Sequence, residues 1–125
     1  MPPVRIVLVE DNEVFRDALE LLLGMRDDVE IVASVGVGAA AVSAAREYRP
    51  DVMLMDYRMP ALDGIQATAQ VVEEVPEVAV VALTASADAA EREALVQAGA
   101  VACLMKDQEL EEIVAAILQA AAATR

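Results

Sequence analysis

Histidine and tryptophan are absent from this chain of 125 residues, and cysteine, lysine and aromatic residues are almost absent. The single cysteine, Cys103, excludes an internal disulfide, which fits a reducing cytoplasm, and we expect the chain to be located there. The aromatic set is Phe15, Tyr48 and Tyr57. A core in this chain must therefore be built from Val, Leu, Ile, Met and Ala.

Basic residues are scarce: nine Lys and Arg stand against 22 Asp and Glu, a net charge of −13. Nucleic acids and anionic membrane surfaces both need a basic face, so direct contact with either is not expected. No apolar stretch approaches the roughly 18 residues of a membrane span. The short apolar run before Glu10 is not that of a signal peptide.

The length is that of one domain, and 58% hydrophobic with 25% charged residues is typical of a globular protein. No linker or low-complexity segment interrupts the pattern. We therefore expect a single domain over residues 1–125.

The chain contains five short apolar runs. In the segments between them, apolar residues recur at helical spacing. Continuous apolar runs are typical of strands covered on both faces, as in a parallel sheet. The pattern predicts an α/β fold: a (βα)5 doubly wound five-stranded parallel sheet with helices on both faces. The runs are Val4–Val9, Val29–Val35, Asp51–Met55, Val78–Leu83 and Val101–Met105.

Helix ends are indicated by single residues. Pro50 and Pro76 each end a helix shortly before a strand, and Gly99 is expected at the end of the helix before the fifth strand. Asp107 is expected to be the N-cap of the final helix.

Polar residues follow four of the five expected strands. Glu10 and Asp11 follow the first, Asp56 the third, Thr84 the fourth and Lys106 the fifth. The carboxyl ends of parallel strands lie along one edge of a sheet, where ligands bind in such folds. We expect these five residues to converge there. Each of them alone is more often an ordinary solvated loop or turn residue, and only their combination indicates a site.

Three carboxylates at one edge repel one another and call for a cation. Mg²⁺ is the expected one, because it binds one or two carboxylates together with waters and a phosphate oxygen. The only lysine, Lys106, adds a second positive charge, and Thr84 adds a hydroxyl. These are the parts of phosphoryl transfer, with Asp56 as the nucleophile.

The chain resembles the receiver domains of two-component response regulators over about residues 4 to 122. The resemblance is carried by Ile-Val-Leu-Val-Glu10-Asp11-Asn12, Asp56-Tyr-Arg-Met-Pro60-Ala-Leu-Asp63-Gly64, Leu83-Thr84-Ala85-Ser86, and Ala98-Gly99-Ala100 through Lys106-Asp107. It implies the flavodoxin-like receiver fold with strand order 2-1-3-4-5.

The resemblance also implies roles for residues. Asp56 would accept the phosphoryl group, with Mg²⁺ (Mn²⁺ as an alternative) held by Glu10, Asp11, Asp56 and the backbone carbonyl of Arg58. Thr84 and Lys106 would contact the phosphoryl oxygens. Apart from its own phosphorylation and dephosphorylation, no enzymatic activity is implied.

Partners are implied as well. A sensor histidine kinase would be the donor, since the chain has no histidine of its own to phosphorylate. A homodimer would form through the fourth helix, fifth strand and fifth helix. Lys106-Asp107, in place of the common Lys-Pro, is similar to the transcription-regulating subfamily whose receivers precede a helix-turn-helix domain, and DNA would be bound only through such a domain, which these residues lack.

The pattern departs from the family at Cys103, where a switching Tyr or Phe is usual. A small buried hydrophobic residue is the simpler interpretation of this cysteine.

Three rival interpretations remain. A flavodoxin-like FMN protein would need a Ser/Thr/Gly-rich loop where Glu10 and Asp11 stand. A haloacid-dehalogenase-type phosphatase would need a second Asp at the position of Arg58. A phosphate-independent pseudo-receiver, acting as a protein-interaction module, would normally lack one of the five residues.

Overall fold

Five parallel strands form one sheet in the computed structural model, which describes residues 2–56, 64–85 and 88–124. The strands are β1 (Val4–Val9), β2 (Val29–Val35), β3 (Val52–Asp56), β4 (Ala79–Thr84) and β5 (Ala102–Met105). The helices are α1 (Glu13–Gly24), α2 (Ala41–Tyr48), α3 (Gly64–Glu74), α4 (Ala89–Gln97) and α5 (Leu110–Thr124), with a short 3-10 turn η1 (Gly38–Ala40) before α2. The predicted (βα)5 fold is confirmed.

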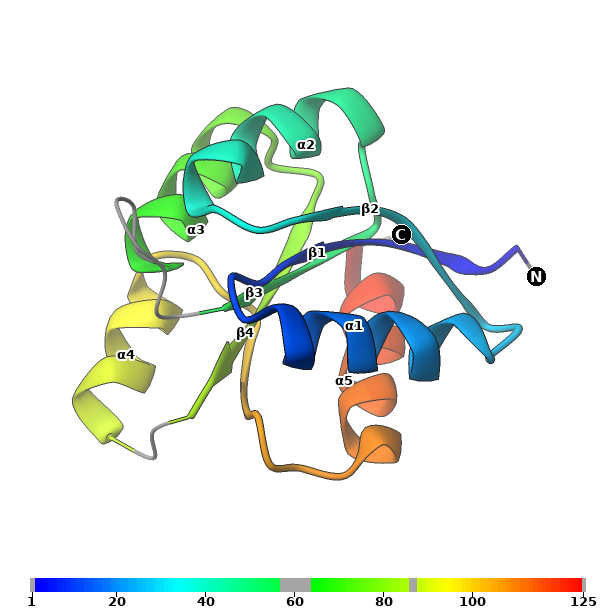
Figure 1. Ribbon diagram of the computed structural model, residues 1–125. Helices are drawn as coiled ribbons and strands as arrows, with labels where there is room; N and C mark the ends of the chain where they lie inside the picture. The colour runs from blue at the N-terminus through cyan, green and yellow to red at the C-terminus, as the bar shows by residue number, and fades with distance from the viewer. Residues whose placement is uncertain (1, 57–63, 86–87, 125) are drawn as a thin grey trace.

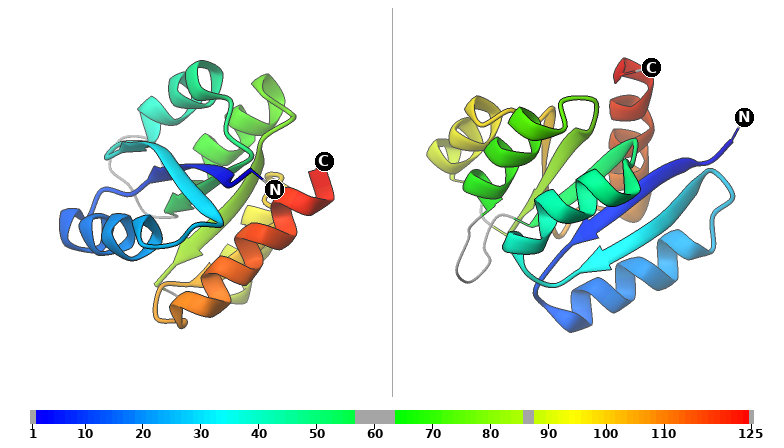
Figure 2. Two further views of the ribbon diagram at one scale, coloured as in Figure 1. Left: turned by 90° about the vertical axis from the view of Figure 1, so that its right-hand side faces the viewer. Right: turned by 90° about the horizontal axis from the view of Figure 1, so that it is seen from above.

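The strand order is β2-β1-β3-β4-β5, and every neighbouring pair is parallel. This is the order that the resemblance to receiver domains implied. Helices α1 and α5 cover one face of the sheet, and α2, α3 and α4 cover the other (Figures 1 and 2). Because both faces are covered, β3 and β4 are buried along their whole length, which explains their unbroken apolar sequences.

The strand boundaries differ slightly from the apolar runs. The first two runs match β1 and β2, whereas β3 and β4 begin and end one residue later than their runs, and β5 begins one residue later. Asp56 pairs with Leu83, and Thr84 pairs with Met105, so these polar residues complete the ladders. Hydropathy could not show this, because the backbone of a polar residue pairs as well as that of an apolar one.

The helix ends confirm three expectations and correct a fourth. Helices α2 and α3 each end two residues before Pro50 and Pro76, and Gly99 follows α4 with a φ of +114°. Asp107 as the N-cap of α5 is wrong. That helix begins at Leu110, and the carbonyl of Glu109 accepts the first helical hydrogen bonds.

The physical reason is a turn between β5 and α5. The side-chain oxygen of Gln108 accepts a hydrogen bond from the backbone N–H of Met105 at 2.7 Å. The backbone N–H of Gln108 in turn donates to the carbonyl of Met105. This turn delays the start of the helix beyond Asp107.

A search of the described residues finds no helix long and apolar enough to cross a membrane.

Gly99 gives a test of the packing between α3 and the turn before β5. A Cβ at this position would lie 2.8 Å from Val72 Cγ2, and its φ of +114° is strained for any L side chain. We expect Gly99→Ala to lower the free energy of unfolding by about 1–3 kcal/mol in urea denaturation. Gly24→Ala is the control, because a Cβ there meets nothing within 4 Å. Equal unfolding free energies for the two variants would contradict this account.

Candidate functional site

The carboxyl ends of the strands gather the polar residues that the sequence singled out. Glu10 directly follows β1, Asp56 is the last residue of β3, and Thr84 is the last residue of β4. All three are buried, with exposed fractions of 0%, 2% and 1%. Burial of two carboxyl groups is costly unless they are paired with cations or share protons, so these residues mark the site.

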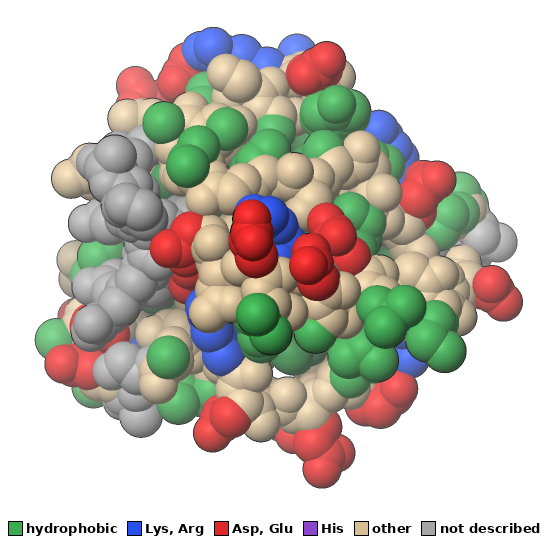
Figure 3. Space-filling view, viewed as in Figure 1, with side chains coloured by type: hydrophobic (Ala, Val, Ile, Leu, Met, Phe, Trp, Pro, Cys, Tyr) green, Lys and Arg blue, Asp and Glu red, His purple; other side chains and the backbone are tan. Residues whose placement is uncertain are grey.

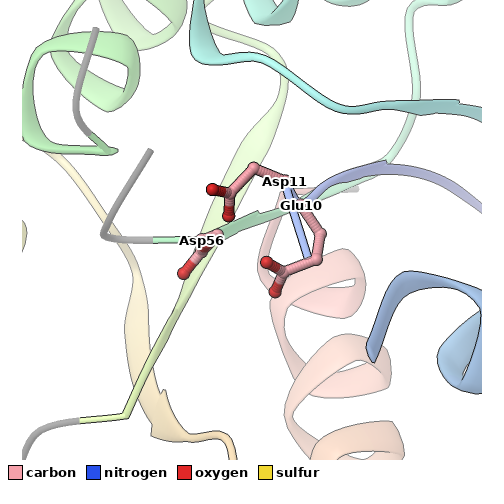
Figure 4. A group of neighbouring side chains, drawn as sticks. All are labelled: Glu10, Asp11 and Asp56. Atoms are coloured by element: carbon pink, nitrogen blue, oxygen red, sulfur yellow. The ribbon is translucent and has the colours of Figure 1, made fainter. Parts of the chain in front are cut away.

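Glu10, Asp11 and Asp56 form one acidic cluster. Each contributes a carboxylate oxygen, and these oxygens lie within 4.8 Å of one another. Figure 4 shows the three groups facing a common space between the end of β1 and the end of β3. Asp11 is exposed, so the cluster opens to solvent on its side.

Lys106 offsets part of this negative charge. Its Nζ lies 2.8 Å from Glu10 Oε1 and 3.1 Å from Asp56 Oδ1. Its backbone N–H donates to the carbonyl of Thr84 at 2.8 Å, which fixes the end of β5 against the end of β4. The five predicted residues are thus brought to one edge of the sheet, from positions as much as 96 residues apart in the chain.

The burial and the mutual repulsion of these groups change their proton affinity. Burial, together with the hydrogen bond and negative charge of Glu10, raises the pKa of Asp56 to about 7, while Lys106 acts in the opposite direction. Desolvation would lower the pKa of Lys106, but Glu10 and Asp56 outweigh it and raise that pKa. Lys106 therefore stays charged, whereas Asp56 is poised to share a proton unless another cation is present.

The residues fit a divalent cation. Mg²⁺ is bound by oxygen ligands at about 2.1 Å in octahedral geometry, which places ligand oxygens ~3–4 Å apart. Three carboxylate oxygens within 4.8 Å of one another need only small movements to reach that spacing. Burial and the neighbouring Glu10 raise the pKa of Asp56, and a bound cation would favour its ionised form.

Three residues at the start of α1, its N-cap included, support the site, and none of them was among the predicted site residues. Asn12 caps the helix, with its side chain accepting from Phe15 N–H at 3.0 Å. The Phe15 ring lies 4.9 Å from Lys106 Nζ, a cation–π contact. Arg16 Nη1 donates to the backbone carbonyl of Glu10 at 2.9 Å. An Asn directly before a helical pattern and the only Phe of the chain were the available signals.

Two predicted site residues, Arg58 and Cys103, are not part of this cluster of described residues. Arg58, whose carbonyl was expected to bind the metal, lies outside the described residues. Cys103 lies half-buried in β5 and packs against a small cluster formed by Ala82, Leu95 and Ala100. Burial raises the pKa of its thiol, so the cysteine is a packing residue rather than a thiolate.

Comparison with known proteins identifies the family. The model of the response regulator receiver domain matches residues 6–118. The chain is 36% identical over 111 residues to the uncharacterized transcriptional regulatory protein YhcZ of Bacillus subtilis, which covers 89% of this chain and 52% of the relative. It is 32% identical over 122 residues to the response regulator GacA of Pseudomonas aeruginosa, covering 98% and 57%. The chain thus spans about half the length of the curated relatives that it matches.

Solved structures agree with this assignment. The signal receiver domain of the putative response regulator NarL from Mycobacterium tuberculosis superposes with a TM-score of 0.92 at 36% identity, covering 98% of both chains. The response regulator domain of Thermotoga maritima CheB superposes with a TM-score of 0.88 at 27% identity, covering 96% of this chain and 97% of that one. With its strand order and its acidic edge of the sheet, this chain belongs to the response regulator receiver domains of two-component systems.

Proposed function

We propose that Asp56 accepts a phosphoryl group from the phosphohistidine of a sensor kinase in a Mg²⁺-dependent reaction. The observation that carries this proposal is the surroundings of the Asp56 carboxylate, which lies within 4.8 Å of the acidic pair Glu10–Asp11 and 3.1 Å from the ammonium group of Lys106, which also contacts Glu10. A nucleophile surrounded by both a cation-binding group and a fixed cation is the arrangement that phosphoryl transfer requires.

The transfer is a substitution at phosphorus. An Asp56 carboxylate oxygen forms the new P–O bond while the P–N bond of the donor breaks, and the electron pair of that bond stays on the donor imidazole. Lys106, whose Nζ is 3.1 Å from Asp56 Oδ1, would stabilise negative charge on the transferred group. Thr84, at the end of the neighbouring strand, would supply a hydroxyl to a phosphoryl oxygen.

Glu10, Asp11 and Asp56 would hold Mg²⁺, or Mn²⁺ in its place, which would supply positive charge to the phosphoryl oxygens and to the ionised Asp56. The backbone carbonyl of Arg58 stays a predicted further ligand. The only chemistry that we propose for the domain is this self-catalysed transfer and the later hydrolysis of the aspartyl phosphate, in which water takes the phosphoryl group and the Asp56 carboxylate is restored, so it is not an enzyme acting on a separate substrate.

The donor must dock beside the site, and α1 offers a surface for it. Three large apolar residues of this helix are exposed, among them Val14 at 81% and Leu21 at 68%, and Met25, directly after the helix, is exposed as well. Val14 lies in the first turn of α1, beside the strand ends that carry the site, whereas the apolar side chains that gather in Figure 3 lie over the C-terminal half of the helix, away from those ends. An exposed apolar patch on a globular domain is typical of a protein-binding surface.

The effect of phosphorylation on transcription would depend on the longer proteins that contain such domains. Relatives are described as transcriptional regulatory proteins, and this chain spans about half of their length. We therefore propose a cytoplasmic transcriptional regulator in which DNA is bound through an effector domain, with homodimerisation through α4, β5 and α5. Because Cys103 has no ring to reorient, coupling to that surface would run through Thr84 and the segment that follows it.

A phosphate-independent pseudo-receiver is the alternative function. It is disfavoured because Glu10, Asp11, Asp56, Thr84 and Lys106 are all present and lie at one edge of the sheet.

Labelling by acetyl phosphate tests the proposal directly. With Mg²⁺ present, we expect the wild-type chain to gain one phosphoryl group by intact-protein mass spectrometry, and Asp56→Asn to gain none, because an amide is not a nucleophile here. Without Mg²⁺ the wild-type rate should fall at least tenfold. Phosphoryl incorporation that persists in Asp56→Asn would overturn the assignment.

The acidic cluster predicts how metal and charge affect stability. Asp11→Asn removes one of three repelling carboxylates, so the metal-free melting temperature should rise by a few degrees. It also removes a ligand, so the increase in melting temperature caused by 10 mM Mg²⁺ should fall to less than half of the wild-type value. Asp27→Asn is the control, because it removes one negative charge at a position away from the site. If Asp11→Asn and wild type respond equally to Mg²⁺, Asp11 is not a ligand.

The raised pKa of Asp56 predicts a pH dependence in the absence of metal. The ordinary pKa of this carboxyl is 3.8, and in the folded protein it is about 7. Between these values the folded state binds more protons than the unfolded one, so this group's contribution to stability is present at low pH and is lost as pH rises through 7. In urea denaturation with EDTA, the difference in unfolding free energy between wild type and Asp56→Asn should shift against the wild type from pH 5 to pH 7.5. A difference that is independent of pH would refute this account.

A further inference from the structure

We propose that Arg16 is a positioning residue that holds the turn carrying Glu10 and Asp11, and that position 36 is glycine because Arg16 occupies the space beside it. The inference rests on the proposed function, since the turn matters most if Glu10 and Asp11 bind a cation. It concerns two residues that neither the sequence motifs nor the acidic cluster itself includes.

Arg16 links the first turn of α1 to the end of β1. Its Nη1 donates to the backbone carbonyl of Glu10 at 2.9 Å, and its side chain is only 21% exposed. The contact with Glu13 is long, 3.9 Å, and Glu13 is largely exposed, so that ion pair contributes little. The hydrogen bond to the Glu10 carbonyl is therefore the main polar contact that the structure gives for this guanidinium group.

The Glu10 carbonyl belongs to the peptide unit that joins Glu10 to Asp11. Because a peptide unit is planar, fixing its oxygen fixes the direction in which the chain enters Asp11. The other groups of Glu10 are held elsewhere. Its N–H donates to the carbonyl of Val35 at 3.0 Å, and its Oε2 accepts from the N–H of Asn12 at 3.1 Å. Arg16 thus holds the peptide carbonyl that sets the path of the chain from the buried Glu10 to the exposed Asp11.

Gly36, which follows β2, leaves room for this contact. A Cβ at position 36 would lie 2.6 Å from Arg16 Nη1 and 3.8 Å from the Glu10 carbonyl oxygen. The backbone of Gly36 does not lie in the left-handed region, so alanine would bring no backbone strain there. The atom in the way is the end of a flexible side chain. Gly36→Ala should therefore displace the guanidinium at little cost to the fold, and the hydrogen bond to Glu10 would be lost.

Arg16 also carries a positive charge near an anionic site, and this effect has the opposite sign. If charge alone mattered, removing the guanidinium would strengthen Mg²⁺ binding, because less positive charge would oppose the ion. If position matters, removing it weakens Mg²⁺ binding. Arg16→Met therefore separates the two roles by the direction of the change, and Gly36→Ala tests position with the charge of the chain unchanged.

The experiment is a Mg²⁺ titration of the ¹⁵N-labelled chain followed by amide chemical shifts. Loss of one hydrogen bond that fixes a ligand-bearing turn is expected to raise the Mg²⁺ Kd about three- to tenfold in both Gly36→Ala and Arg16→Met. Gly24→Ala and Arg46→Met are the matched controls and should keep the wild-type Kd. Gly24 has open space around it, and Arg46 forms an exposed pair with Glu74.

A second readout needs no metal. The backbone N–H of Asn12 donates to Glu10 Oε2, so the hydrogen exchange of this backbone amide reports the order of the turn in the metal-free protein. It should exchange several times faster in Gly36→Ala and Arg16→Met than in the two controls. A Mg²⁺ Kd within twofold of wild type in both variants, or tighter binding in Arg16→Met, would overturn the inference.

The two proposals fail in different ways. If the wild-type chain binds no Mg²⁺, the proposed function is wrong, and Asn12 exchange alone decides whether Arg16 orders the turn. If the wild type binds Mg²⁺ and both variants bind it equally well, the proposed function stands and the positioning role of Arg16 is wrong.

Discussion

The repulsion among three carboxylates at the edge of a parallel sheet is the constraint on which the rest of this structure depends. Glu10 and Asp56 are buried, and Asp11 lies beside them with only one lysine within contact of the two buried groups. Uncompensated, such a cluster would oppose folding. Burial and the neighbouring Glu10 raise the pKa of Asp56, and Lys106 opposes this shift without cancelling it. A site that lacks positive charge in this way is suited to bind a cation and to respond strongly when a charged group is added.

The fold supplies the precision that such a site needs. Its groups come from the ends of four different segments, and the core ladders of β1, β3 and β4 hold their backbones in register. The backbone N–H of Lys106 donates to the carbonyl of Thr84, and this bond holds the point from which the lysine side chain extends to the carboxylates. Because strands buried on both faces do not move independently, the distances within the site are set by the core rather than by the loops.

Helix α1 has a second role besides covering the sheet. Asn12 caps this helix by accepting from Phe15 N–H, the Phe15 ring contacts Lys106, and Arg16 donates to the Glu10 carbonyl. The same helix presents exposed apolar residues to solvent. Among these, Val14 lies in the first turn, next to the residues that order the acidic pair.

Hydropathy alone determined the fold class, because strands buried on both faces must be continuously apolar and the helices between them must be amphipathic. It also determined that Glu10, Asp11, Asp56, Thr84 and Lys106 would meet, since parallel strands place their carboxyl ends together. Residue patterns could not place the start of α5, because the turn at Gln108 depends on a side-chain bond to Met105. Nor could they reveal the hydrogen bond of Arg16 to the Glu10 carbonyl, or that Gly36 lies so close that a Cβ there would be 2.6 Å from Arg16 Nη1. Periodicity records which residues are buried, whereas these bonds depend on the directions of particular side chains and, at Gly36, on the approach of a segment distant in the chain, and that is why tertiary structure alone decided them.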